Sequence, residues 1–171
     1  MGVAAVEAVA EIAGVAARLK WPNDVVWAGP GDDTDRKLGG ILAEADWSDG
    51  SEPAVVVGLG LNVNWPSAFP DDLRPIATSL NHIAGHDIDR EKLLVAILRQ
   101  LDEWCDDERR VLDAVRDRSA TLGSRVRVHL ASGILEGVAM DLTAQGHLVV
   151  ATDDGGHRVV TVGDVVHLRP V

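Results

Sequence analysis

The sequence has one cysteine, few basic residues and no long apolar run. Its single cysteine, Cys105, excludes an internal disulfide framework and fits a protein of the reducing cytoplasm. No stretch reaches the roughly 18 uninterrupted apolar residues that a membrane-spanning helix needs, because Glu7 and Glu11 interrupt the apolar opening of the chain. That opening also lacks a basic leader, which argues against a signal peptide. We therefore expect a cytoplasmic protein with no membrane partner.

Positive charge is scarce throughout. The chain has 16 Lys and Arg against 27 Asp and Glu, a formal net charge of −11. This balance argues against nucleic acid as a partner, because binding to the phosphate backbone depends on Lys and Arg. Only three of the basic residues are lysines, namely Lys20, Lys37 and Lys92, so each is a candidate for a specific role. The length of 171 residues suffices for one core plus a small appendage.

The first part of the chain predicts a helix followed by strands. Residues 2–13 place Glu7 and Glu11 one turn apart and opposite valines, which is typical of an amphipathic helix, and Gly14 is a natural end for it. Alternating and apolar runs predict strands at 15–21, 25–28, 38–47 and 54–61. The last of these is apolar on both faces, which predicts a central position in the sheet. Three prolines make 62–77 an irregular loop.

The rest of the chain divides into a helical part and a β part. Apolar residues over 94–115 follow the 3.6-residue period and predict a long helix with a break near Asp106-Asp107. After residue 122 the pattern becomes five short alternating runs separated by glycine-containing turns, at 125–130, 134–140, 147–151, 158–162 and 165–168. Five strands in about fifty residues predict a small barrel. We therefore predict two domains, 1–121 and 122–171.

Three short segments carry the chemical signal. They are Lys-Trp-Pro-Asn-Asp at 20–24, Arg-Lys-Leu-Gly-Gly-Ile-Leu at 36–42 and Gly-Leu-Gly-Leu-Asn-Val-Asn at 58–64. Glycines within strands make sense where a ligand approaches the backbone, and asparagine amides can pair with a purine edge. A lysine beside such glycines can neutralise a carboxylate or a phosphate. Taken singly, each segment is more simply explained as a turn, a β-bulge or space for packing.

A dinucleotide-binding fingerprint is excluded at the third segment, because Val63 stands where the third glycine is required. Together and in this order, however, the three segments resemble the biotin–protein ligase family, and Ala-Thr-Ser-Leu at 77–80 resembles the family's segment after its proline-rich loop. The resemblance covers essentially residues 2–171. It implies an α+β fold: a mixed sheet with helices, part of a class II synthetase-like domain, followed by a small C-terminal SH3-like barrel.

The resemblance also implies a two-step reaction. Biotin is activated by ATP, with Mg²⁺, as biotinyl-5′-AMP and is then transferred to a lysine of a biotin carboxyl carrier domain. Lys37 would be the catalytic residue, touching both the biotin carboxyl oxygen and the α-phosphate. Asn62 would read adenine, and Asp24 would hold Mg²⁺. Trp65 or Phe69 would shield the adenine ring.

Two sets of binding residues follow from the resemblance. The biotin-binding set is Lys37, Gly39, Gly40, Ile41, Gly58 and Gly60. The ATP-binding set is Asn23, Asp24, Lys37, Asn62 and Asn64.

One family feature lies outside these 171 residues. The family's Gly/Arg-rich biotin and phosphate loop and a Ser-Thr pair precede the segment that matches 20–24, and neither is in this sequence. We therefore expect a chain that is incomplete for catalysis by itself, with an unpaired sheet edge and an exposed apolar face. The alternatives are a non-catalytic protein that binds an adenylate or a carrier domain, and a lipoate–protein ligase. The matches at 20–24 and 58–62 and the small barrel disfavour the lipoate ligase. A homodimer is compatible with the sequence.

Overall fold

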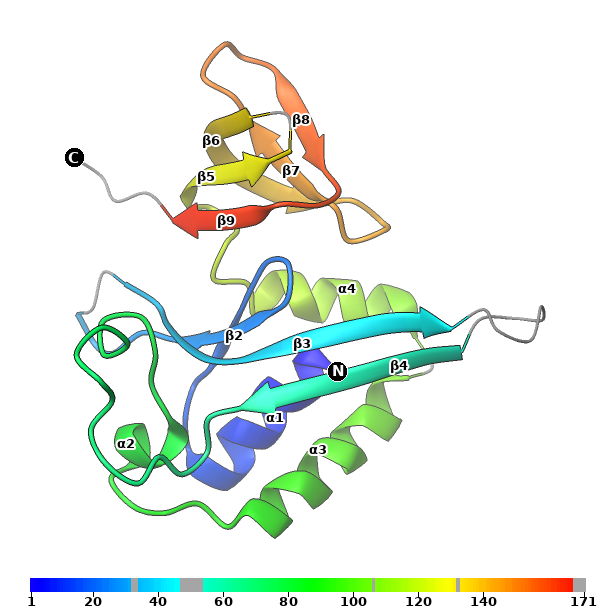
Figure 1. The fold of residues 1–171 in the computed structure, drawn as a ribbon. Coiled ribbons are helices and arrows are strands. Elements are labelled where there is room, and N and C mark those ends of the chain that lie inside the picture. The colour runs from blue at the N-terminus through cyan, green and yellow to red at the C-terminus, as the bar shows by residue number, and fades with distance from the viewer. Residues whose placement is uncertain (32–33, 47–53, 106, 132, 168–171) are drawn as a thin grey trace.

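The computed structural model describes residues 1–31, 34–46, 54–105, 107–131 and 133–167. Asp106 and the predicted strand ends Trp47 and Leu168 lie outside these ranges. A larger part with one sheet and helices is followed by a smaller part that consists of strands (Figure 1). Over the described ranges, no helix is both long and apolar enough to cross a membrane.

The larger sheet has four strands in the order β1–β2–β3–β4. They are β1 (Arg18–Lys20), β2 (Asp24–Trp27), β3 (Arg36–Asp46) and β4 (Ala54–Leu61), which confirms the four predicted strands. The α+β class is also confirmed, but the mixed sheet is not, because every ladder is antiparallel. Among the described residues, parallel pairing is confined to two isolated bridges, Leu19 with Ser119 and Lys37 with Ala77.

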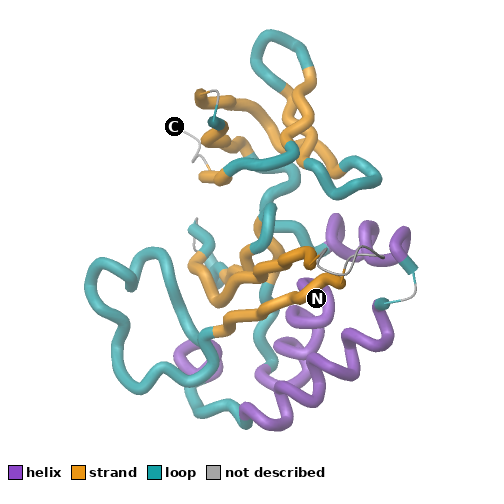
Figure 2. Tube along the Cα trace, turned by 45° about the vertical axis from the view of Figure 1, so that its right-hand side comes forward, coloured by secondary structure: helices purple, strands orange, loops and turns teal. Residues whose placement is uncertain are grey.

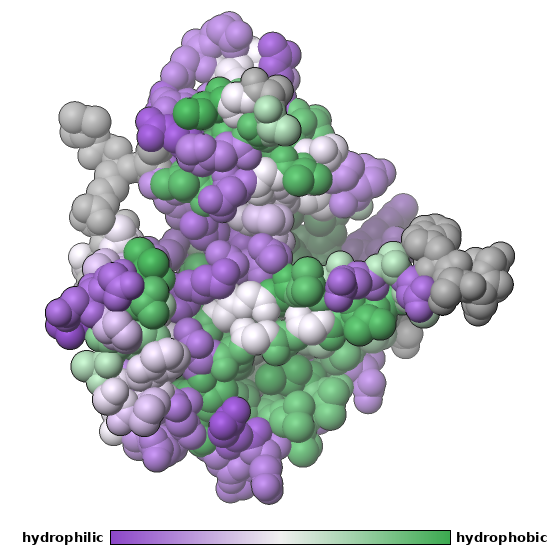
Figure 3. Space-filling view, in the orientation of Figure 1, coloured by the Kyte–Doolittle hydropathy of each residue, from purple (hydrophilic) through white to green (hydrophobic). Residues whose placement is uncertain are grey.

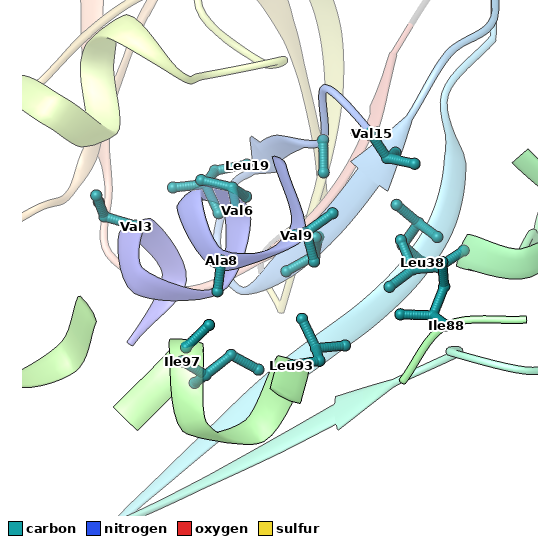
Figure 4. Close-up of a cluster of buried hydrophobic side chains, with 14 of the residues drawn as sticks. Val3, Val6, Ala8, Val9, Val15, Leu19, Leu38, Ile88, Leu93 and Ile97 are labelled. Carbon is teal, nitrogen blue, oxygen red and sulfur yellow. The ribbon is translucent and has the colours of Figure 1, made fainter. Parts of the chain in front are cut away.

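Two helices cover one face of this sheet (Figure 2). Helix α1 (Gly2–Ala13) is the predicted one and ends at Gly14, whose φ of 65° is left-handed and therefore suits glycine. It packs against α3 (Arg90–Trp104). A short helix that the sequence did not predict, α2 (Leu80–Ala84), follows the proline-containing loop. The buried side chains labelled in Figure 4 come from the helices, the strands and the loops between them: Val3, Val6, Ala8, Val9, Val15, Leu19, Leu38, Ile88, Leu93 and Ile97. Each fully buried aliphatic side chain contributes about 1.5–3 kcal/mol.

The predicted break in the long helix is confirmed. Helix α3 ends at Trp104 and α4 (Glu108–Asp117) begins after Asp107. The Asp107 carboxylate accepts a hydrogen bond from the backbone N–H of Arg110 at 3.0 Å, so it caps the first turn of α4.

The smaller part is a five-stranded antiparallel sheet with a core of its own. Its strands are β5 (Arg125–Leu130), β6 (Gly133–Leu142), β7 (Leu148–Ala151), β8 (His157–Val160) and β9 (Asp164–His167), in the order β8–β7–β6–β5–β9. All five were predicted. The closed barrel was not found, because within the described ranges the end strands β8 and β9 do not pair with each other. Alternation of apolar residues predicts strands with one buried face, but it does not determine whether the first and last strands meet.

The position of β4 differs from the prediction. Within the part of the chain that the structure describes, β4 is an edge strand, not a central one, and Val55, Val56 and Val57 are 61%, 64% and 40% exposed. Leu42 on β3 is exposed as well, and so are three residues of α3, Leu94, Val95 and Leu98. Figure 3 shows apolar surface along β3, β4 and α3. This confirms the expected unpaired edge and apolar face.

We expect the native chain to bind a hydrophobic fluorescent dye, because this apolar surface is contiguous and water-exposed. Replacing Val55 and Val56 by threonine should lower the dye fluorescence while leaving the strand propensity intact. Val162→Thr is the matched control, because Val162 is 80% exposed but lies in the smaller part. Dye fluorescence no higher than that of an ordinary small monomeric protein would contradict the prediction.

Candidate functional site

The centre of the candidate site is an ion pair between two neighbouring strands. Lys37 Nζ on β3 lies 2.5 Å from Asp24 Oδ1 at the start of β2, and the Lys37 side chain is 51% exposed. The pairing register shifts between Val25 and Val26, so that Leu38 is an extra residue on β3. Lys37 and Gly40, three residues apart, would otherwise face opposite sides of the sheet. The bulge places them on one face, with Lys37 Nζ 3.4 Å from the position of a Cβ on Gly40.

The face beside Lys37 carries glycines on both strands. Gly40 pairs with Gly60, and Gly58 lies two residues before Gly60 on β4. A Cβ on Gly58 or Gly60 would meet only a carbonyl oxygen at 3.9 Å. We call Gly40, Gly58 and Gly60 the glycine patch. The patch leaves the backbone of β3 and β4 open to a ligand at the end of the sheet where Lys37 lies.

Gly39 has a different function from the patch. A Cβ on Gly39 would lie 2.3 Å from the carbonyl oxygen of Gly60, a distance that no real Cβ adopts. Gly39 is therefore required by the close approach of β3 and β4, and it faces away from the patch. Ile41 contributes its backbone, whose N–H and carbonyl both form hydrogen bonds with Asn23.

Asn23 holds the turn before β2 against β3. Its carbonyl accepts a hydrogen bond from the Ile41 N–H at 2.9 Å, and its side-chain amide donates to the Ile41 carbonyl at 2.7 Å. These two hydrogen bonds fix the turn that presents Asp24 to Lys37. The structure therefore brings together three predicted residues, Asn23, Asp24 and Lys37, with the glycine patch.

The loop after β4 fixes the backbone of Lys37. The Lys37 N–H donates to the Ile76 carbonyl at 2.7 Å, and the Thr78 N–H donates to the Lys37 carbonyl at 2.9 Å. Asn62 joins the same arrangement, because its backbone N–H donates to Leu38 and its side-chain amide donates to the Thr78 carbonyl at 3.1 Å. Asn62 thus lies next to the strand that carries Lys37.

Asn64 and the aromatic residues stabilise the loop itself. The Asn64 amide donates to the Ile88 carbonyl and accepts from the Ile88 N–H, both at 2.9 Å, so both ends of the side chain are used. Trp65 stacks on Phe69 with ring centroids 4.3 Å apart, and Phe69 is buried. These contacts give Asn64 and Phe69 a packing role in this conformation, and Trp65 remains partly accessible.

The predicted magnesium ligand stands without other metal-binding side chains. Among the described residues, no three His, Cys, Asp or Glu side chains cluster as a metal site, and the carboxylate of Asp24 is paired with Lys37. Magnesium is commonly held by one or two carboxylates together with substrate phosphates. The side chains in the described part of the chain therefore do not form a magnesium centre without further ligands.

Sequence reasoning missed a set of polar contacts that joins the two parts of the molecule. The Trp21 N–H donates to the hydroxyl oxygen of Thr121 at 3.0 Å. His167 Nε2 lies 3.4 Å from the same oxygen, and His167 Nδ1 lies 3.2 Å from Asp35 Oδ2. We call Trp21, Asp35, Thr121 and His167 the bridging network. A local pattern could not have revealed it, because Trp21 and Thr121 are 100 residues apart in sequence.

Asp35 gives a pH-dependent prediction. The hydrogen bond from His167, with the positive charges of Arg18 and Lys20, holds the pKa of Asp35 below its usual 3.8. A carboxyl with a lowered pKa in the folded state adds stability above the unfolded pKa, and this is lost as the pH falls through the lower folded value. Asp35→Asn should therefore lower the free energy of unfolding at neutral pH, and this effect should shrink as the pH falls below 3.8 and through the lowered pKa of Asp35.

Guanidinium unfolding curves measured across that pH range would check this, with Asp71→Asn on an exposed loop as the control. An Asp35→Asn effect that is equal at both ends of the range would refute the electrostatic origin.

The fold and the site define a class: an α+β part with an open glycine surface beside one lysine, followed by a smaller β part with a core of its own. The profile of the "Biotin/lipoate A/B protein ligase family" matches residues 1–62, and that of the "Biotin protein ligase C terminal domain" matches residues 121–168. The chain belongs to the biotin protein ligase family.

Individual relatives agree with this assignment. The biotin–[acetyl-CoA-carboxylase] ligase of Mycobacterium tuberculosis is 41% identical over 157 residues, which are 88% of this chain and 53% of that protein. The bifunctional ligase/repressor BirA of Bacillus subtilis is 32% identical over 163 residues, which are 92% of this chain and 48% of that protein. The chain thus spans about half the length of the curated relatives it matches.

Solved structures show the same fold. The biotin protein ligase of Aquifex aeolicus matches with a TM-score of 0.80 and 25% identity, over 98% of this chain and 72% of that one. Its complex with biotin and ATP matches with a TM-score of 0.77 and 26% identity, over 99% of this chain and 69% of that one.

Proposed function

We propose that the protein is a biotin–protein ligase, with Lys37 as its catalytic residue. The observation that carries the proposal is the position of Lys37 Nζ, at the open glycine patch and beside Asp24. Membership of a family whose relatives are named as biotin ligases supports the choice of substrate. The non-catalytic and lipoate-ligase alternatives have no comparable support.

In the first step, a carboxylate oxygen of biotin attacks the α-phosphorus of ATP. The new O–P bond gives biotinyl-5′-AMP, and the bond to the β-phosphate oxygen breaks to release pyrophosphate. Two anions must meet, and negative charge then increases on the phosphoryl oxygens. The Lys37 ammonium lowers this barrier because it neutralises both groups where they meet. Asp24 holds Lys37 in place until the substrates take over part of that contact.

The neighbouring residues have supporting roles in this proposal. The backbone of Gly39, Gly40, Ile41, Gly58 and Gly60 borders the biotin rings, with the glycine patch leaving room for them. Asn62 contacts adenine, Asn23 positions the turn on the nucleotide side, and Trp65 covers the ring. Mg²⁺ would arrive with the phosphates of ATP, and Asp24 is the carboxylate nearest to them.

In the second step, the amine of a carrier-protein lysine attacks the biotinyl carbonyl. An amide bond forms, the C–O bond to AMP breaks, and the amine loses a proton. The partner is a biotin carboxyl carrier domain. Nucleic acid is not proposed as a partner, because the chain carries a formal net charge of −11.

We further propose the division at residues 121 and 122, an SH3-like barrel for the second domain, and a cytoplasmic location. A homodimer is compatible with the exposed edge of β4.

The direct test is biotin-dependent exchange of pyrophosphate into ATP by the purified chain. Exchange above a biotin-free control supports adenylation. A chain that binds biotinyl-AMP, as shown by an increased melting temperature, but gives no exchange would favour the non-catalytic alternative. A larger melting shift with lipoyl-AMP than with biotinyl-AMP would favour lipoate. The absence of both exchange and biotinyl-AMP binding would overturn the proposal for this chain.

A further inference from the structure

The bridging network allows only one arrangement of hydrogens if every group is satisfied with a neutral imidazole. The backbone N–H of Trp21 can only donate, so the Thr121 oxygen accepts from it at 3.0 Å. The Thr121 hydroxyl hydrogen is then available to His167 Nε2 at 3.4 Å. His167 must in turn carry its hydrogen on Nδ1, which faces Asp35 Oδ2 at 3.2 Å.

These groups are shielded from water, so water is a poor substitute for the partners. Thr121 is fully buried, and the side chains of His167 and Asp35 are 22% and 13% exposed. The charged groups that face Asp35 from β1 are Arg18 and Lys20, and both favour its ionised form. A buried hydroxyl with a donor on one side and an acceptor on the other fixes the distance between them.

Both ends of the network lie in the segments that form the candidate site. Trp21 directly precedes Pro22, Asn23 and Asp24, the turn that presents the carboxylate. Asp35 is two residues before Lys37 and directly precedes β3, which begins at Arg36. Trp21 has a second contact with the small domain: its indole N–H donates to the Gly146 carbonyl at 3.0 Å.

We propose that Thr121 and His167 are positioning residues: by joining Trp21 to Asp35 they set the placement of Asp24 relative to Lys37, and they make that placement depend on a docked small domain. The inference rests on the proposed function, because its consequence is a change in the rate of adenylation. It assigns the second domain a role in the first chemical step.

The experiment compares three variants, each measured in the same complemented form that shows biotin-dependent exchange. Thr121→Val keeps the shape and removes the hydroxyl, Thr121→Ser keeps the hydroxyl, and His157→Asn on exposed β8 is the control. We expect Thr121→Val to lower kcat for biotin-dependent exchange about tenfold or more, since small misplacements of reacting groups have effects of this size. KM for ATP should change less, and Thr121→Ser and His157→Asn should stay within about twofold of the parent.

A purely structural role would instead reduce the folded fraction and leave kcat per folded molecule unchanged, which would overturn the inference. So would a Thr121→Val variant with parental kcat. If Thr121→Val fails to fold, His167→Phe at the partly exposed end of the network is measured in its place, with the same expectation.

A readout independent of activity separates this inference from the proposed function. Nitrogen-15 NMR of the imidazole should show the hydrogen of His167 on Nδ1, and the amide signals of Asn23 and Lys37 should shift in Thr121→Val but not in Thr121→Ser. These signals in the parent, with no exchange even in a complemented form, would refute the proposed function and keep the coupling. The opposite tautomer, or unshifted Asn23 and Lys37 amides, would overturn the coupling.

Discussion

Lys37→Ala should lower the rate of biotin-dependent pyrophosphate exchange by about 10²-fold or more, which is the effect of removing one preorganised charge-stabilising donor from a reacting centre. Among the described residues, Lys37 Nζ is the cationic group that lies at the glycine patch. Without it, the biotin carboxylate and the α-phosphate would meet with their repulsion uncompensated. The measurement is the initial rate of exchange at saturating biotin and ATP in a complemented or longer form of the protein, because the 171 residues are expected to be incomplete for catalysis by themselves.

The controls separate charge from folding. The Lys37–Asp24 pair is half exposed on the lysine side, and such pairs contribute only about 0–1 kcal/mol to stability, so Lys37→Ala should melt close to the parent. Lys92→Ala on α3 removes a lysine that pairs with Asp89, outside the candidate site, and should leave exchange unchanged. Lys37→Arg keeps the charge on a bulkier planar group and should recover only part of the rate. Parental exchange in Lys37→Ala would remove Lys37 from the catalytic role.

Gly39→Ala should destabilise the fold by about 2–3 kcal/mol, the upper range for forcing an extra carbon into a close-packed site. The new Cβ would overlap the Gly60 carbonyl at 2.3 Å, and its other neighbours include the backbone of Leu61 at 3.2 Å. Backbone atoms cannot rotate away as a side chain can, so β3 and β4 would have to separate. Urea unfolding gives the change in free energy.

Gly58→Ala is the matched control, since its Cβ would meet only the Leu42 carbonyl at an ordinary 3.9 Å. We expect its stability within about 0.5 kcal/mol of the parent. Because Gly58 lies on the glycine patch, Gly58→Ala tests ligand access, whereas Gly39→Ala tests strand packing. Equal destabilisation by both substitutions would show that the close approach of β3 and β4 at Gly39 is not the cause of the loss of stability.

Local patterns predicted most of the elements. The spacing of Glu7 and Glu11 gave α1, and the alternation after residue 122 gave all five strands of the small sheet. The two aspartates near residue 106 predicted the break between α3 and α4, because aspartate favours the N-cap position that Asp107 occupies. These features depend on neighbours a few residues apart.

What could not be predicted depends on partners distant in sequence. The apolar sequence of β4 is compatible both with a strand covered on both faces and with an exposed strand. The edge position of β4 was therefore missed. The bulge at Leu38, which brings Lys37 and Gly40 to one face, is a property of the β2–β3 register. The family resemblance named Lys37, Asp24 and Asn23 as site residues, and the structure brings them together. It did not name Thr121 or His167, because a buried threonine and a strand-end histidine have no distinctive spacing.

The contacts of β1 have a consequence for the order in which the chain can fold during synthesis. The Leu19 N–H donates to the Arg118 carbonyl, and the Leu19 carbonyl accepts from the Ala120 N–H. Strand β1 therefore has one unpaired edge until residue 120 has left the ribosome, about a hundred residues after β1 itself. Contacts of such long sequence separation form slowly, and an edge left open meanwhile can pair with the wrong chain. Release of the last helix of the larger part is thus the moment at which its sheet can first be closed on that side.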